Sequence, residues 1–133
     1  MLCPYCNNDA KLVYGMKIYP HRPDLFYKHF WECEPCKAYV GCHSGTEIPL
    51  GTLANAFLRQ KRSHAHLAFD TLWKDKHFKS RTAAYQWLAS KMGLPSNKCH
   101  IAMFDKEQCN EVLDAVTDYW QDKLSNKDTA RVE

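Results

Sequence analysis

Two pairs of cysteines are the strongest chemical signal in this sequence: "CPYC" contains Cys3 and Cys6, and "CEPC" contains Cys33 and Cys36. Two residues between paired thiols let both sulfurs face one ion, and two such pairs make a closed tetrahedral site. Thiolates prefer zinc or iron to magnesium or calcium. The spacing therefore predicts one structural Zn²⁺ on the four cysteines, with a rubredoxin-type iron site and a redox dithiol as alternatives.

The other cysteines lack this spacing. Cys42 and His43 follow the second pair by six and seven residues; either could replace a ligand, but a buried strand cysteine is the favoured interpretation of Cys42. Cys99, His100 and Cys109 are spaced irregularly, with no fourth partner nearby. Core packing and a helix cap explain these three better than a second metal.

The residues around the cysteine pairs predict a small β-rich module over residues 1–43. The stretch "KLVYGMKIY" alternates as a half-buried strand does, with one face formed by Leu12, Tyr14, Met16 and Ile18. Pro20 and Pro23 then interrupt it, and "KHFWEC" and "AYVGCH" are two further short strands. We therefore expect a zinc ribbon, a β-hairpin with about three short strands, followed by a linker over residues 44–51.

Helical periodicity begins at Thr52 and predicts a three-helix part over residues 52–124, followed by a flexible tail over residues 125–133. The first helix has a broad apolar face with Leu53, Phe57, Ala65, Ala68, Phe69 and Leu72. Arg59, Arg62, His66 and Asp70 are predicted to lie on the opposite face.

The next two helices have recognisable ends. Ser80 is a plausible N-cap of "RTAAYQWLASKM", and Gly93 is its stop signal. Asp105 and Gln108 have the spacing of a capping box at the start of "KEQCNEVLDAVTDYWQDKL". The predicted fold class is therefore α+β, with an N-terminal Cys₄ zinc ribbon followed by three helices.

Composition narrows the class of protein. Of 133 residues, 45% are hydrophobic, which is enough for a core and argues against wholesale disorder. No apolar run approaches the length of a membrane span, and "MLCPYC" lacks the features of a signal peptide. We therefore expect a cytoplasmic protein without a membrane partner, in which paired thiols hold metal more often than they form disulfides.

Charge is distributed unevenly although the net charge is only +3. Residues 59–81 contain seven Lys or Arg and two Asp, so this segment carries +5. Residues 105–122 contain six acidic residues and one Lys. Such asymmetry is compatible with an anionic ligand on one face, and equally with an ordinary solvated helix surface.

The order and spacing of several segments resemble a zinc-finger-containing family of bacteriophage and prophage genomes. These segments run from Cys3 to about Val116 and include "CPYC", "YPHRPDL", "FWECEPCKAYVGCH", "PLGTLANAFLR", "AYQWLASKMGLP" and "CHIAMFD". The resemblance implies a zinc finger on Cys3, Cys6, Cys33 and Cys36 and a phage or mobile-element origin, hence the cytoplasm of a bacterial host. It implies no particular activity.

The sequence predicts that the protein is not an enzyme. Candidate acid, base or ligand groups are His21, Asp24, His43, His66 and Asp70. They form no recognisable His-Asn-His order, and no phosphate-binding loop, serine-nucleophile elbow or paired-carboxylate motif is present. A zinc-containing nuclease is the less favoured alternative, and no small-molecule substrate is inferred.

The predicted function is nucleic-acid binding through basic and aromatic side chains. The candidate residues are Arg22, Phe26, Tyr27, Arg59, Arg62, Lys74, Lys76, Lys79 and Arg81. The alternative is a protein–protein adaptor, or an inhibitor of host machinery or host defence, that docks through the loop "PHRPDLFY". The remaining aromatic residues of the ribbon are more often its core than a stacking surface.

Overall fold

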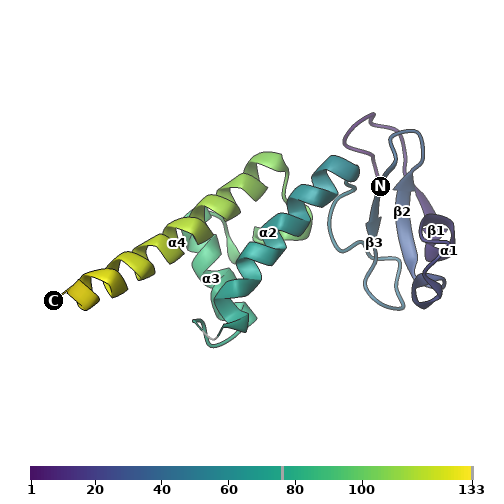
Figure 1. The fold of residues 1–133 in the computed structure, drawn as a ribbon. Helices are drawn as coiled ribbons and strands as arrows, with labels where there is room; N and C mark the ends of the chain where they lie inside the picture. Colours follow the sequence, from purple (N-terminus) through teal and green to yellow (C-terminus); the bar gives the residue numbers. More distant parts are fainter. Residues whose placement is uncertain (76, 133) are drawn as a thin grey trace. The chain divides into compact units, whose positions relative to one another are not determined.

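The computed structural model describes residues 1–75 and 77–132, with side chains described as far as Ser125. The fold is α+β: a three-stranded antiparallel sheet near the N-terminus is followed by helices (Figure 1). The chain forms two compact units, Met1–Gln60 and Lys61–Glu133. We call them the finger and the helical unit. No helix within the described residues is long and apolar enough to cross a membrane.

The sheet of the finger consists of β1 (Lys11–Tyr14), β2 (His29–Cys33) and β3 (Ala38–Gly41), in that order. On one face, Trp31 is paired with Val40 and lies in the core that surrounds the cysteine pairs. On the other face, Phe30 is buried against Tyr19 and Tyr39, whose hydroxyl groups are 2.8 Å apart. The two strands predicted around the second cysteine pair are confirmed.

The first strand is shorter than the alternation predicts. It ends at Tyr14, and the chain continues in a helical turn, α1 (Gly15–Ile18). Gly15 is buried, and a Cβ atom at this position would clash with the carbonyl oxygen of Leu25. Because of this turn, Tyr14 and Met16 are 56% and 50% exposed, and the prediction that they lie on a half-buried strand face is wrong.

Residues 44–51, predicted as a linker, fold back onto the sheet. The backbone N–H of Leu50 donates to the carbonyl of Gly41, and the indole N–H of Trp31 donates to the carbonyl of Glu47. Further along, Ala54 exchanges two backbone hydrogen bonds with Tyr39. The segment therefore belongs to the finger.

Helix α2 (Ala56–Lys74) begins four residues later than the sequence predicts. Asn55 is its N-terminal cap, since its side-chain oxygen accepts a hydrogen bond from the N–H of Leu58. Leu53, placed on the apolar face of this helix by its periodicity, instead lies fully buried in the finger core. Backbone pairing with β3 therefore overrides the local helical pattern.

The helical unit contains most of α2 together with α3 (Arg81–Met92) and α4 (Lys106–Val132). The predicted caps are confirmed: the Ser80 hydroxyl accepts from the N–H of Ala83, and Gly93 is left-handed with φ 68°. Asp105 and Gln108 form the reciprocal bonds of a capping box. Helix α4 continues to Val132, beyond the predicted end of the helical part at residue 124. Flexibility of residues 125–133 stays a prediction, because the side chains beyond Ser125 lie outside the described part.

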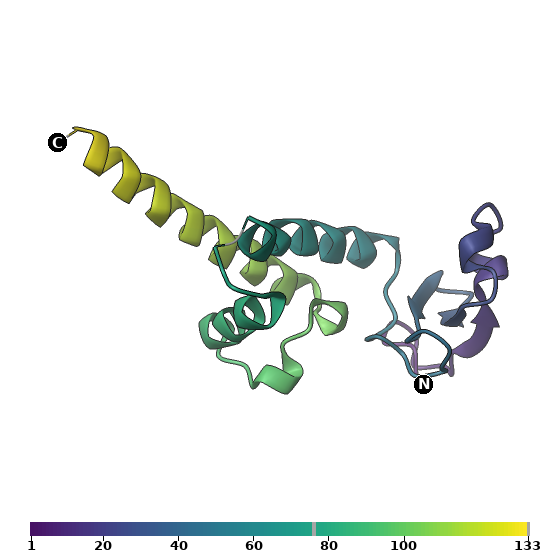
Figure 2. The same cartoon turned by 90° about the horizontal axis from the view of Figure 1, so that it is seen from below.

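Side-chain contacts join the helices of this unit. The rings of Phe69 and Tyr85 join α2 to α3 with their centroids 4.3 Å apart. The indole N–H of Trp120 on α4 donates to the hydroxyl of Thr71 on α2 over 3.0 Å. Helices α3 and α4 lie side by side, as both ribbon views show (Figures 1 and 2).

Arg62 lies on the buried face of α2, and its predicted position opposite the apolar stripe is wrong. It is only 8% exposed, and its Nε–H donates to the carbonyl oxygen of Phe104 over 2.9 Å. Its spacing from Ala65 and Phe69 is three and seven residues, so all three face the same core. Two members of the predicted stripe do not belong to it, since Leu53 precedes the helix and Phe57 is 53% exposed.

We predict that Arg62→Met destabilises the helical unit by about 1–3 kcal/mol, because the buried carbonyl of Phe104 loses its donor while the apolar stem is retained. Urea unfolding followed by circular dichroism measures the change. The control is Arg81→Met at an exposed position of α3, which should change stability by less than about 0.5 kcal/mol. Equal stability of the two variants would contradict a structural role for Arg62.

Candidate functional site

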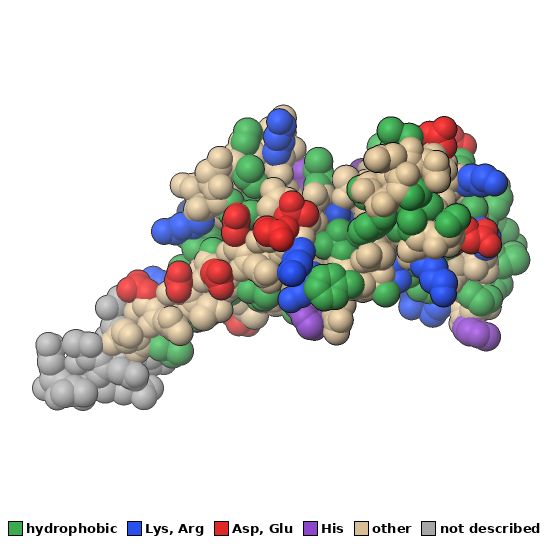
Figure 3. Space-filling view, turned by 90° about the horizontal axis from the view of Figure 1, so that it is seen from above, with side chains coloured by type: hydrophobic (Ala, Val, Ile, Leu, Met, Phe, Trp, Pro, Cys, Tyr) green, Lys and Arg blue, Asp and Glu red, His purple; other side chains and the backbone are tan. Residues whose placement is uncertain are grey.

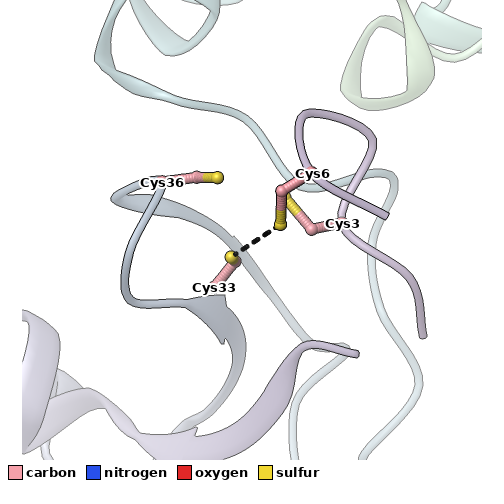
Figure 4. A group of neighbouring side chains, drawn as sticks. All are labelled: Cys3, Cys6, Cys33 and Cys36. Carbon is pink, nitrogen blue, oxygen red and sulfur yellow. Dashed lines mark hydrogen bonds between the residues drawn. The ribbon is translucent and has the colours of Figure 1, made fainter. Parts of the chain in front are cut away.

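The four paired cysteines converge on one point in the finger. Cys3 and Cys6 come from the N-terminal turn, Cys33 ends β2, and Cys36 lies in the turn before β3 (Figure 4). Their four sulfur atoms all lie within 4.8 Å of one another, and the sulfurs of Cys6 and Cys33 are 3.6 Å apart. Cys3 and Cys33 are buried, and the other two are half-buried. Among the described residues this is the one group of three or more His, Cys, Asp or Glu side chains placed to hold a metal ion.

The size of this cluster fits zinc. Zn–S bonds of about 2.3 Å in a tetrahedron place the sulfurs about 3.8 Å apart. The separation of 3.6 Å between the sulfurs of Cys6 and Cys33 is close to that value, and no disulfide is present, since all four cysteines are free. Four thiolate ligands complete the coordination sphere, so a metal held here is structural.

The backbone turns after the two pairs are alike. Asn7 and Lys37, each directly after the second cysteine of its pair, are left-handed, with φ 63° and 52°. Asn tolerates this conformation, whereas for Lys it is uncommon. In both turns the backbone folds back on itself: the N–H of Asn7 donates to the carbonyl of Cys3, and that of Lys37 to the carbonyl of Glu34. The turns thus aim the two sulfurs of each pair at one point.

The environment of the sulfurs favours metal-bound thiolates. A hydrogen bond from the backbone N–H of Asn8 lowers the pKa of Cys6 to about 7. The pKa of Cys36 is instead raised to about 12, chiefly through the hydrogen bond between its thiol and the sulfur of Cys6. Neighbouring thiolates repel one another, and a divalent cation bound between them offsets this repulsion. Metal binding and deprotonation of the cysteines are therefore coupled.

The metal centre forms one wall of the small finger core. Cys3 and Cys33 pack with the buried side chains of Ala10, Ala38, Val40 and Leu53. Because so few apolar residues are buried, the metal supplies much of the stability of the finger, as expected for a module of this size.

The sequence comparison identifies the family. Residues 1–119 match the model of a zinc-finger-containing domain, DUF3268, and the chain belongs to this family. Together with the four-sulfur geometry, this assigns one structural Zn²⁺ to Cys3, Cys6, Cys33 and Cys36. Searches of curated proteins and of solved structures find no match.

The other cysteines are core residues. Cys42, Cys99 and Cys109 are all buried, and burial raises the pKa of each thiol, which keeps it neutral. None belongs to a metal-binding group among the described residues. The interpretation of Cys99 and Cys109 as core residues is thus supported.

The predicted basic residues differ in exposure and in the groups they contact. Lys74, Lys79 and Arg81 are exposed near the junction of α2 and α3. Arg59 is half-buried: its guanidinium lies 3.8 Å from the centre of the Tyr39 ring and donates to the carbonyl of Ala54. Arg62 is buried, as described above, and Lys76 lies outside the described residues. The remaining residue of the set, Arg22, is exposed and forms an ion pair with Asp24.

The predicted aromatic pair lies beside an apolar pocket that the sequence did not reveal. Phe26 is half-buried, and Tyr27 is 83% exposed. They line a pocket of about 600 Å³ together with Val13, Tyr14, Met16 and Lys17. Tyr14 and Met16 could not be assigned to it from sequence, because their alternation indicated a strand that continues through the turn.

We predict that Cys33→Ser reduces bound zinc from one equivalent to near zero and unfolds the finger sheet, because three thiolates cannot complete the tetrahedron. Apparent zinc binding of about 10–16 kcal/mol acts as folding free energy in such modules. Elemental analysis and NMR amide dispersion measure the two effects. Cys42→Ala is the control, because this buried thiol is not a ligand and its variant should keep one zinc. Full zinc occupancy in Cys33→Ser would refute the assignment.

Proposed function

We propose that this protein is a non-enzymatic, zinc-stabilised binding module that docks a partner protein through the apolar pocket of the finger. The pocket is the observation that carries the proposal. Its lining is almost entirely apolar, and Tyr27 stands at its edge with most of its ring exposed. An aromatic side chain next to a concave apolar surface is the usual arrangement of an interface hot spot.

The charges around the pocket favour a protein over a nucleic acid. Lys17 is the charged residue of the lining, and its ammonium group is held by Glu32 and Glu34. A site for a nucleic-acid backbone needs cations that are available to phosphates. An apolar side chain of a partner protein requires none, so we propose such a side chain as the occupant.

The metal centre supports the non-enzymatic part of the proposal. Four cysteine ligands leave no open coordination position at which zinc could activate water or polarise a substrate. The finger is thus a scaffold that presents its outer surface. We further propose, from the resemblance to a phage and prophage family, that the partner is a host or phage protein, and that the module acts as an adaptor or as an inhibitor of host machinery or defence.

We predict that Tyr27→Ala weakens partner binding about thirtyfold, which corresponds to the loss of about 2 kcal/mol typical of an aromatic hot spot. A photoreactive phenylalanine analogue at position 27 first captures the partner from bacterial lysate. Calorimetry with the purified partner then measures Kd for each variant.

The matched control is Leu67→Ala, because Leu67 is also an exposed apolar residue, 67% accessible, but lies on α2. Its variant should bind the partner like the parent protein. Equal affinities of the Tyr27→Ala variant and the parent protein would contradict docking at the pocket.

Nucleic-acid binding is the second candidate, and one observation favours it. Lys74, Lys79 and Arg81 are exposed within a short segment, and they remain at the surface although Lys74 lies 3.7 Å from the Asp70 carboxylate and Arg81 lies over the Tyr85 ring. The case is weaker than the sequence suggested, because Arg62 is buried and Arg59 is held by Tyr39 and by backbone carbonyls.

We predict for this candidate that changing Lys74, Lys79 and Arg81 together to Gln flattens the salt dependence of oligothymidine binding by about two units of slope. Each phosphate contact on a single strand contributes about 0.7 units through counterion release. Fluorescence anisotropy at several salt concentrations measures the slope. Lys11, Lys28 and Lys98, also exposed, provide a control triple-Gln variant of equal charge, which should keep the parent slope. Absence of binding at ~50 mM salt would exclude this candidate.

A further inference from the structure

A second recess lies on the helical unit, between α3 and α4. It has a volume of about 710 Å³. We call it the α3–α4 groove, and it is lined by Trp87, Lys91, Met92, Glu111, Asp114, Ala115, Asp118, Tyr119, Asp122 and Lys123. The finger pocket and this groove share no residue, so they are separate surfaces.

Two aromatic rings of the lining, one from α3 and one from α4, are held in place by ring contacts. Trp87 and Tyr119 meet edge to face, with their centroids 5.5 Å apart. Phe78 supports both rings, with its centroid 5.7 Å from each of them. The two lining rings are therefore held in fixed orientations, a property that reduces the entropy lost when a ligand packs on them.

The α4 wall of the groove also carries a row of carboxylates. Glu111, Asp114, Asp118 and Asp122 recur every three or four residues, so they follow one face of the helix. At 1.5 Å per residue the row is about 16 Å long. All four residues are exposed, and none forms an ion pair with a described residue. Acidic side chains in a row along α4 are visible in Figure 3.

The groove already accommodates an ammonium group of the chain itself. Lys123 Nζ lies 5.5 Å from the centre of the Tyr119 ring, within the range of a cation–π contact. With Lys91 as the other basic residue, the lining carries four carboxylates and two ammonium groups, a net charge of −2. The recess therefore combines ring faces, apolar surface and an excess of negative charge.

We propose that the α3–α4 groove docks a lysine- or arginine-rich segment of a partner protein. Its cations would face the carboxylate row, and the stems of its side chains would pack on Trp87, Tyr119 and Met92. The carboxylates follow the pitch of a helix, which suits an amphipathic helical segment with cations at the same spacing. This site is independent of the finger pocket.

The arrangement disfavours other occupants. A nucleic acid would bring its phosphates against four carboxylates. A divalent cation needs oxygen ligands that converge at about 2.0–2.6 Å, whereas these carboxylates are spread along three turns of α4. A peptide matches both the length of the row and the mixed character of the lining.

The test uses full-length, zinc-loaded protein and a fluorescein-labelled helical 15-residue peptide of Lys and Leu, with Lys spaced three and four residues apart. Anisotropy at ~50 mM salt measures Kd. We expect Asp114→Asn with Asp118→Asn to weaken binding roughly two- to thirtyfold, as the loss of two exposed charge pairs implies. The charge-matched control is Asp75→Asn with Glu107→Gln, two exposed residues outside the groove, which should bind like the parent.

Several outcomes would overturn the proposal. These are absence of peptide binding, equal weakening by the control variant, or equal binding of a peptide with Glu in place of each Lys. A fourth is self-association of the protein that the Asp114 and Asp118 changes abolish while the peptide does not compete, because a second copy would then be the occupant. Circular dichroism of each variant verifies the fold, and the Asp-to-Asn changes keep side-chain shape at exposed positions.

Discussion

The finger depends on the convergence of four thiolates on one metal ion. Two turns, at residues 3–6 and 33–36, are distant in the chain, and their sulfurs lie within 4.8 Å of one another. Without a cation, four thiolates at this distance repel, as the raised pKa of Cys36 indicates. When zinc is bound, its attraction for the four thiolates outweighs their mutual repulsion. The metal then links the N-terminal turn to the end of β2.

This dependence on metal explains the outer surface of the finger. Zinc and a small inner core stabilise the sheet, and several apolar side chains of the finger lie outside that core. Tyr14, Met16 and Tyr27 are accordingly left exposed around a concave apolar pocket. Exposed concave apolar surfaces often mark interaction sites, which is why we interpret this one as a docking site.

The helical unit is organised differently, since its described residues form no metal-binding group. Its three helices bury an apolar interior and use Arg62 to satisfy the carbonyl of Phe104. Its charges are left for the surface, with basic residues near the α2–α3 junction and acidic residues along α4. The chain thus joins a metal-stabilised finger with an exposed apolar pocket to a helical unit with charged surfaces.

Features set by local chemistry could be read from the sequence alone. The zinc ligands follow from the Cys-x-x-Cys spacing, the ends of α3 from Ser80 and Gly93, and the start of α4 from its capping box. Each depends on residues a few positions apart, or on a ligand chemistry that only thiolates provide, so no knowledge of distant contacts is needed.

Other features depend on contacts between residues that are far apart in the chain, and only the tertiary structure shows them. The turn after the first strand requires Gly15 because the carbonyl of Leu25 leaves no room for a Cβ, and Leu53 lies in the finger core instead of in the helix. Arg62 is buried because Phe104, 42 residues away, offers a carbonyl. The α3–α4 groove likewise exists only where the two helices meet. In each case the deciding atom belongs to a residue remote in sequence, so periodicity and charge patterns could not identify it.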